Sequence, residues 1–227
     1  MPFPDLHERL QEVRSRIHRS VQRGGHGQTV TIVAVTKTHG PDAVEAAWKA
    51  GVADIGENRV QEAVSKMDAV SAPVRWHLIG HLQRNKVKSL PRFDLLHALD
   101  SPRLAAAVHE LGTERGTPVD ALVQVNVSGE ETKGGYSLES LAVDAARLRE
   151  HTGIRVRGVM TMAPFDADER TLRSVFARAR QAGEILRDAG HEATELSMGM
   201  SNDYEIAVEE GATFVRLGTV LFGARPA

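Results

Sequence analysis

The chain has 227 residues, of which 41% are hydrophobic and 26% charged, as expected for a globular protein with a sizeable core. Its formal net charge of −2 gives no electrostatic reason to expect nucleic acid or an anionic membrane as a partner. The absence of cysteine excludes disulfides, thiolate zinc sites and a cysteine nucleophile. No stretch has the apolar character of a signal peptide or a membrane span, so we expect a soluble cytoplasmic protein.

The segment 1–25 is predicted to form an amphipathic helix that packs on the rest of the chain. Apolar residues recur there at steps of three or four and end at two glycines: Leu6, Leu10, Val13, Ile17, Val21, Gly24 and Gly25. Short apolar runs then predict eight strands, at 31–37, 54–58, 75–80, 93–99, 120–127, 156–162, 194–198 and 214–218. Between them the sequence predicts helices at 42–50, 60–67, 83–90, 102–115, 138–150, 168–189 and 202–210, and a last helical turn at 220–222.

The regular alternation of strands and helices predicts an α/β fold with parallel strands joined by right-handed crossovers. Eight such units are typical of a closed (β/α)8 TIM barrel, the interpretation we favour, with one domain over residues 1–227. An open doubly wound sheet is the alternative, because spacing along the chain does not determine the order of strands in a sheet.

Lys37 closes the first apolar run and is the first candidate site residue. Side chains alternate along a strand, which places Val33, Val35 and Lys37 on one face. An ammonium group at the end of such a row either meets an anion or loses its proton and becomes a nucleophile. A lysine that only extends from the strand end into solvent is the alternative.

Two loops near the end of the chain favour an anion site. In TIM barrels a phosphate often binds after the seventh and eighth strands. The first of these loops contains Gly199, Ser201 and Asn202, and Asn202 is expected to cap the next helix. Gly218 and Thr219 follow the eighth strand, where further backbone N–H groups are available to an anion. Each loop alone is typical of an ordinary turn, and only their joint position indicates a phosphate site.

Two more polar residues are placed at strand ends. Arg216 shares a face of the eighth strand with Gly218, and a guanidinium inside a barrel needs an acceptor. That acceptor is either a ligand or an inward carboxylate such as Glu57. Asn58 ends the second strand, where it either binds a ligand or caps the following helix.

His77 and Met160 complete the candidate binding residues with less specific signals. His77 is either a hydrogen-bonded core residue or part of a ligand wall, and its spacing from His81 does not indicate a zinc site. Met160, on the sixth strand, is either a cofactor contact or barrel packing. We assign no metal ligand and no catalytic residue.

The candidate residues together indicate a phosphorylated carbonyl ligand. The first and eighth strands are neighbours in a closed barrel, so Lys37 is expected beside the two anion loops. An aldehyde or ketone bound there would form an imine, or Schiff base, with Lys37. Pyridoxal 5'-phosphate (PLP) and a sugar phosphate of the aldolase kind both fit.

Several stretches resemble the pyridoxal phosphate homeostasis protein family. They are Val33-Ala34-Val35-Thr36-Lys37, Gly56-Glu57-Asn58 with Gln61-Glu62, Trp76-His77-Leu78-Ile79-Gly80 with Leu82-Gln83 and Asn85-Lys86, Arg157-Gly158-Val159-Met160, Ser197-Met198-Gly199-Met200-Ser201 with Asp203, and Val215-Arg216-Leu217-Gly218-Thr219. They cover nearly the whole chain, and the later motifs are long enough to be highly specific.

The resemblance implies a barrel like the N-terminal domain of alanine racemase. It implies PLP held as an imine on Lys37, with its phosphate near Ser201, Gly218 and Thr219. Arg216 is expected to face the pyridine nitrogen. The resemblance also implies a role in PLP homeostasis, which affects amino-acid and keto-acid pools, without established catalytic turnover.

A PLP-dependent amino-acid racemase is the alternative function, and it needs a second acid/base group opposite Lys37. In alanine racemase this group is a tyrosine that another subunit contributes through an added β domain. The sequence ends at Ala227, just past the eighth strand, and its tyrosines are Tyr136, in a loop, and Tyr204, in a predicted helix. Arginine at the pyridine nitrogen would also weaken PLP as an electron sink. We therefore expect a PLP-binding homeostasis protein, a monomer, with PLP-dependent apoenzymes as candidate partners.

Overall fold

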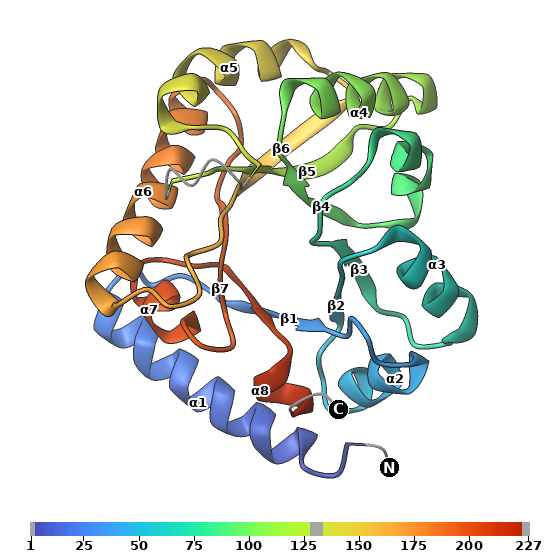
Figure 1. The fold of residues 1–227 in the computed structure, drawn as a ribbon, viewed down its shortest axis with the longest axis vertical. Coiled ribbons are helices and arrows are strands. Elements are labelled where there is room, and N and C mark those ends of the chain that lie inside the picture. Colours follow the sequence, from blue (N-terminus) through green and yellow to red (C-terminus); the bar gives the residue numbers. More distant parts are fainter. Residues whose placement is uncertain (1–2, 128–133, 224–227) are drawn as a thin grey trace.

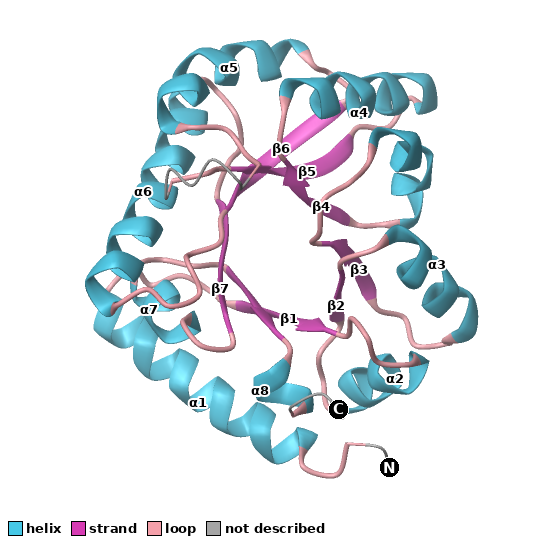
Figure 2. Ribbon diagram, in the orientation of Figure 1, coloured by secondary structure: helices cyan, strands magenta, loops and turns pink. Residues whose placement is uncertain are grey.

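Eight parallel strands form a closed barrel in the computed structural model, which describes residues 3–127 and 134–223. The strands follow one another around the ring in chain order, and β8 pairs with β1 to close it (Figures 1 and 2). They are β1 (Thr31–Val35), β2 (Asp54–Glu57), β3 (Arg75–Leu78), β4 (Leu95–Leu99), β5 (Val119–Gln124), β6 (Ile154–Met160), β7 (Glu195–Met200) and β8 (Phe214–Leu217). The TIM-barrel prediction is confirmed, and the open sheet is excluded.

Helices surround the ring of strands, as Figure 2 shows. They are α1 (Leu6–Gly24), α2 (Pro41–Lys49), α3 (Val60–Ala69), α4 (Pro102–Arg115), α5 (Leu138–Glu150), α6 (Glu169–Asp188), α7 (Tyr204–Glu209) and α8 (Thr219–Phe222). The segment predicted as a helix at 83–90 is instead a 3₁₀ helix, η1 (Arg84–Arg92). Pro91 lies inside it and has no N–H to donate, which disfavours a regular α-helix there. Among the described residues no helix combines the length and apolar character needed to cross a membrane.

The core has two parts because strand side chains alternate between the inside and the outside of the barrel. The larger part lies between the strands and the surrounding helices. A small inner cluster consists of Leu95, Ala98, Leu122 and Met160, which come from β4, β5 and β6. The barrel interior also holds polar side chains, among them His77 and His97, and Phe214 packs against both of these rings and against the inner cluster.

The first helix packs beside the last elements of the chain, in agreement with the prediction for residues 1–25. Figure 1 shows α1 running along α7 and α8. Its apolar stripe, with Leu10 and Val13, is buried, and ion pairs such as Arg23 Nε with Glu209 Oε1, at 2.6 Å, border it. The rings of Phe3, His39 and Phe222 contact one another at centroid distances of 5.2–5.4 Å. The start of the chain therefore packs against the loop that follows β1.

Gly199 is required where β7 meets α7. Its φ of 93° lies in the left-handed region, and a Cβ there would stand 2.6 Å from Ala207 Cβ. The helix that follows begins later than predicted, at Tyr204 with Asp203 as its N-cap residue. The prediction that Asn202 caps it is wrong, because the Asp203 carboxylate accepts the Met200 N–H at 2.5 Å and so closes the loop.

Replacing Gly199 with alanine is expected to destabilise the protein by about 2–4 kcal/mol, because backbone strain and overpacking add. Gly116→Ala is the matched control: its φ of 66° is also left-handed, but no atom lies within 4 Å of its would-be Cβ. The control is expected to cost only about 1–2 kcal/mol. Urea unfolding of both variants measures the difference, and equal losses would contradict the close approach at Gly199.

Candidate functional site

A cavity of about 1230 Å³ opens at the C-terminal ends of the strands. Six of the eight predicted binding residues line it: Lys37, Asn58, Ser201, Arg216, Gly218 and Thr219. They come from β8 and from the loops after β1, β2, β7 and β8. This is the end of a TIM barrel where loops build binding sites. His77 and Met160 are not among the lining residues.

Lys37 lies in a turn rather than on the strand, because β1 ends at Val35. The carbonyl of Thr36 accepts the N–H of His39 at 3.0 Å, which closes the turn around Lys37. Thr38, the third residue of the turn, has a φ of 69°, as in a type II turn. A β-branched residue rarely adopts this conformation, and it costs about 1–3 kcal/mol unless its surroundings impose it. The backbone next to the candidate nucleophile is therefore held in a strained shape.

A buried ionic cluster lies outside the barrel, directly behind this turn. Lys66, on α3, donates from Nζ to the Thr36 carbonyl at 2.7 Å and to Glu57 Oε1 at 2.6 Å. Glu57 also accepts a hydrogen bond from the Thr36 hydroxyl. The alternative in which an inward Glu57 pairs with Arg216 is excluded, since strand alternation turns Glu57 toward α3. Burial raises the pKa of Glu57, although the bonds to Lys66 and Thr36 oppose this.

Arg216 is a buried cation that faces the cavity. Its Nη1 donates to Ser197 Oγ at 2.6 Å, and its Nη2 donates to the Thr161 carbonyl at 2.9 Å. Within residues 3–127 and 134–223 no carboxylate forms an ion pair with it. Burial lowers the pKa of Arg216 to about 10, and the charge of Asp203 opposes the shift. A guanidinium without a carboxylate partner favours an anionic or lone-pair acceptor in the cavity.

Ser201 joins the two anion loops. Its hydroxyl oxygen accepts the N–H groups of Gly218 and Val220, each at 3.3 Å. Gly218 lies against β1, since a Cβ on it would stand 3.5 Å from the Val35 carbonyl oxygen. The loops after β7 and β8 therefore converge beside the strand that leads to Lys37, as predicted.

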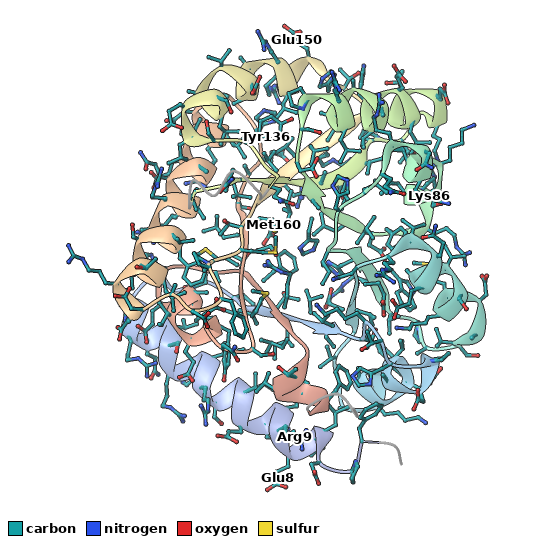
Figure 3. The ribbon with its side chains drawn as sticks, viewed as in Figure 1. Glu8, Arg9, Lys86, Tyr136, Glu150 and Met160 are labelled. Atoms are coloured by element: carbon teal, nitrogen blue, oxygen red, sulfur yellow. The ribbon has the colours of Figure 1, made fainter. Side chains whose placement is uncertain are left out.

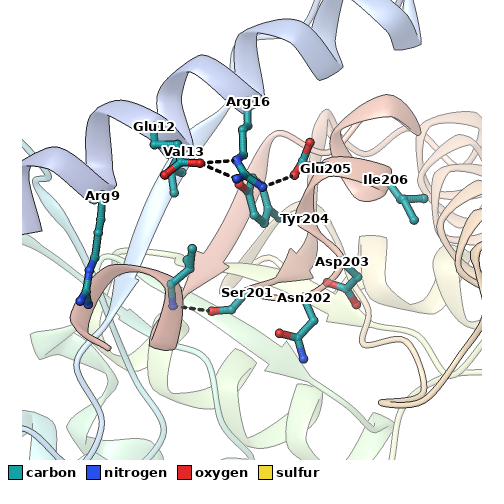
Figure 4. A pocket seen from close by; sticks show the side chains of 11 residues that line it. Arg9, Glu12, Val13, Arg16, Ser201, Asn202, Asp203, Tyr204, Glu205 and Ile206 are labelled. Atoms are coloured by element: carbon teal, nitrogen blue, oxygen red, sulfur yellow. Dashed lines mark hydrogen bonds and ion pairs between the residues drawn. The ribbon is translucent and has the colours of Figure 1, made fainter. Parts of the chain in front are cut away.

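A smaller pocket of about 390 Å³ lies on the other side of this loop, under α1 (Figure 4). Figure 4 shows Arg16 between Glu12 and Glu205, and the Arg16–Glu205 contact is 3.2 Å. The two arginines that line this pocket, Arg9 and Arg16, already pair with carboxylates, so the pocket attracts an anion less than the cavity does.

The wall of the cavity opposite Lys37 was not predicted. There Asp100, after β4, contacts His81 Nδ1 through Oδ2 at 2.6 Å, and Gln124 donates to the Gly134 carbonyl at 2.8 Å. Asn58 lines the cavity and does not cap α3, whose N-cap residue is Arg59. The described residues contain no group of three or more histidine, aspartate or glutamate side chains arranged to hold a metal ion.

His77 belongs to a hydrogen-bonded chain that crosses the barrel interior below the cavity. At one end the Asp54 carboxylate contacts Arg75, and its Oδ1 lies 2.9 Å from His77 Nε2. His77 Nδ1 lies 2.9 Å from His97 Nε2. His97 Nδ1 lies 2.9 Å from the Oγ of Ser197. Since Ser197 also accepts from Arg216, the chain connects the cavity to the opposite end of the barrel.

One arrangement of protons satisfies every contact in this interior chain with both imidazoles neutral. The Ser197 hydroxyl donates to His97, His97 donates from Nε2 to His77, and His77 donates from Nε2 to Asp54. Burial and the positive charge of Arg216, to which a protonated His77 would add, hold the pKa of His97 well below its ordinary value. Burial alone would raise the pKa of Asp54, but the bonds to His77 and Arg75 outweigh it and lower that pKa. Arg216 is therefore held by a neutral serine, and the hydrogen-bonded chain that starts at this serine ends at the distant Asp54 carboxylate.

The tyrosines and Met160 lie away from the cavity. Met160 lies within the ring of strands (Figure 3), where it is 1% exposed and packs in the inner cluster. Tyr136 is buried in the outer core, and its backbone pairs with Gln124 and Asn126. Tyr204 is buried at the start of α7. None of these three residues is among those that line the cavity.

Residues 9–226 match the family model described as the alanine racemase N-terminal domain. The "pyridoxal phosphate homeostasis protein" of Aquifex aeolicus is 39% identical over 222 residues, which cover 96% of this chain and 97% of that protein. The protein of the same name from Escherichia coli K12 is 35% identical over 97% of both chains. The chain belongs to the pyridoxal phosphate homeostasis protein family.

Solved structures agree with this family membership. PipY of Synechococcus elongatus, 35% identical, superposes with a TM-score of 0.86 without PLP and 0.85 with PLP bound. In both cases the match covers 96% of this chain and 100% of PipY. Alanine racemase of Corynebacterium glutamicum, 16% identical, has a TM-score of 0.72, and the match covers 94% of this chain and 62% of the racemase. The homeostasis-protein barrel therefore shares its fold with alanine racemase.

For this member of the family, the neutral state of His97 is expected to make stability depend on pH. The unfolded chain binds a proton at His97 near pH 6.5, and the folded protein does so only at much lower pH. The free energy of unfolding therefore falls as pH decreases below 6.5, with a limiting contribution of about 1.4 kcal/mol per pH unit.

Urea unfolding between pH 7.5 and 5 tests this contribution. His97→Gln is expected to reduce the slope of unfolding free energy against pH by up to the equivalent of one bound proton. The control His7→Gln, at an exposed position on α1, is expected to leave this slope unchanged. Identical slopes in all three proteins would show that folding does not lower the pKa of His97.

Proposed function

We propose that this protein binds PLP in the cavity, with Lys37 forming an imine with the aldehyde, and that it acts in PLP homeostasis. One observation carries the proposal: the Lys37 amine, the buried Arg216 guanidinium, which has no ion-pair partner among the described residues, and the Ser201 hydroxyl beside Gly218 all line one cavity. These groups match the aldehyde, the pyridine nitrogen and the phosphate of PLP. The names of the relatives and the PLP-bound structure of PipY support the same ligand.

Each part of the cavity has a place in the proposal. Ser201, Gly218 and Thr219 hold the phosphate, and Asn58 donates or accepts a hydrogen bond at the ring. Arg216 donates to the pyridine nitrogen. His77 and Met160, which lie below the cavity wall, act indirectly: His77 through the interior hydrogen-bonded chain, and Met160 by packing inside the barrel.

We further propose that the protein holds PLP without turnover. PLP supplies an electron sink when bound, and a protonated pyridine nitrogen makes that sink strong. Arg216 cannot give up its proton to the pyridine nitrogen as a carboxylic acid does, so the nitrogen stays unprotonated. Tyr136 and Tyr204 do not line the cavity, so neither supplies a second base opposite Lys37.

The proposal includes a cytoplasmic monomer that delivers PLP to apoenzymes. The large hydrophobic side chains that are exposed among the described residues are Trp48, Val143 and Phe165, which lie on α2, on α5 and after β6. Single exposed residues of this kind are normal for a monomer. Light scattering of the purified protein tests the monomer.

Lys37→Ala is expected to abolish covalent PLP. Wild-type protein mixed with PLP is expected to turn yellow, and after borohydride reduction mass spectrometry should map the adduct to the peptide with Lys37. Lys49→Ala, a matched change at an exposed lysine on α2, is expected to behave like wild type. An adduct on another lysine would contradict the assignment, and a wild type that stays colourless would favour a sugar-phosphate lyase.

Exchange of the α-hydrogen distinguishes holding PLP from racemisation. PLP-loaded protein incubated with L-alanine in deuterated water is expected to leave the α-hydrogen in place, because an unprotonated pyridine nitrogen beside Arg216 makes PLP a weak electron sink. Proton NMR and chiral chromatography measure the result. Deuterium incorporation with inversion, absent in Lys37→Ala, would establish a racemase.

A further inference from the structure

We infer that Glu62 and Lys66, two residues of α3 that do not line the cavity, are positioning residues for Lys37. They hold the backbone on both sides of Lys37 and thereby aim its amine into the cavity. The inference rests on the proposed imine at Lys37 and adds the residues that make this lysine competent to form it.

Side chains of α3 contact the backbone on both sides of Lys37 in the sequence. On its N-terminal side, Lys66 Nζ donates to the Thr36 carbonyl at 2.7 Å. On its C-terminal side, the Thr38 N–H donates to Glu62 Oε1 at 2.7 Å. The two α3 residues are linked to each other, since Lys66 Nζ lies 3.0 Å from the same Glu62 oxygen. One face of α3 therefore holds the backbone of the residue before Lys37 and of the residue after it.

The conformation of Thr38 requires that hydrogen bonds of this kind hold its backbone. A threonine with a φ of 69° is held there only when its neighbours fix the backbone. The Glu62 carboxylate does this by accepting the Thr38 N–H. Burial alone would raise the pKa of Glu62, but the Thr38 amide and Lys66 outweigh it and keep that pKa below its ordinary value. The Glu62 carboxylate is therefore ionised at neutral pH and accepts the hydrogen bond from the Thr38 N–H.

The burial of Lys66 also indicates a positioning role. Its side chain is 5% exposed, and that of its partner Glu57 is 0% exposed. Removing two charges from water costs free energy that a buried ion pair often fails to recover. Apolar residues of similar volume would attach α3 to β2 equally well, but they would not bind the Thr36 carbonyl. The cluster thus provides a fixed donor and a fixed acceptor at the turn.

Placement of the amine affects one covalent step. Lys37 Nζ, as the free amine, would attack the aldehyde carbon; a C=N bond would replace the C=O bond, and the oxygen would leave as water with the two amine hydrogens. The rate of this step depends on how often the amine lies within reach of the carbon. Non-covalent binding of the phosphate and the ring depends on other residues, so the two effects are separable.

The test compares imine formation with non-covalent binding. Glu62→Ala is expected to slow formation of the yellow species about ten- to a hundredfold in stopped-flow mixing with PLP. In the Lys37→Ala background, the same change is expected to leave the dissociation constant for PLP within about twofold. Glu62→Gln keeps an acceptor oxygen for the Thr38 N–H and is expected to recover much of the rate.

Glu45→Ala is the matched control, because Glu45 Oε1 also accepts a backbone N–H, that of Ser71 at 3.1 Å, and does not line the cavity. It is expected to leave the imine rate unchanged. Hydrogen exchange of the Thr38 amide in PLP-free protein gives a second measurement, and it is expected to be faster in Glu62→Ala.

An unchanged imine rate in both Glu62 variants would overturn the inference, and so would an equal loss of rate and of non-covalent affinity. If Glu62→Ala does not fold, the Glu62→Gln rate and the Thr38 exchange decide in the same way. Failure of the proposed function gives a different result, because wild-type protein would then form no imine.

Discussion

The arrangement of the cavity depends on a guanidinium buried without an ion-pair partner among the described residues. Removing the Arg216 charge from water is unfavourable, and the barrel offsets the cost only with a serine oxygen and a backbone carbonyl. In the proposed function, an acceptor on the bound ligand offsets the rest of this cost. The same cation lies on β8, next to the strand that leads to Lys37, so the acceptor and the amine share one end of the barrel.

The interior of the barrel is divided between packing and hydrogen bonding. Apolar side chains from β4, β5 and β6 form one cluster, and the hydrogen-bonded chain of Asp54, His77, His97 and Ser197 crosses the interior beside it. Such a chain is stable only when each member finds its partner, because an unsatisfied polar atom in a low dielectric is costly. The chain also fixes the tautomers of both histidines, which in turn orients the serine that holds Arg216.

Much of the fold and part of the site could be predicted from the sequence. The eight apolar runs, separated by glycine and proline, determine the number of units, and the position of loops after the seventh and eighth strands locates Ser201, Gly218 and Thr219. The inward face of the second strand could not be predicted, because a shift of one residue in register reverses every side chain. For that reason the sequence left open whether Glu57 pairs with Arg216. The contact between His77 and His97 was also missed, since two strands bring together residues twenty positions apart. The four-residue spacing of Glu62 and Lys66, which places them on one helix face, was the only feature of the sequence that pointed to their contacts beside Lys37.

The pairing of β1 with β8 brings together residues that lie far apart along the sequence. In the proposed function, the Lys37 amine and the loops proposed to hold the phosphate meet only when β8 closes the barrel against β1. A fragment of this chain that lacked β8 would keep Lys37 but lose Gly218 and Thr219, and it would be expected to sequester little PLP.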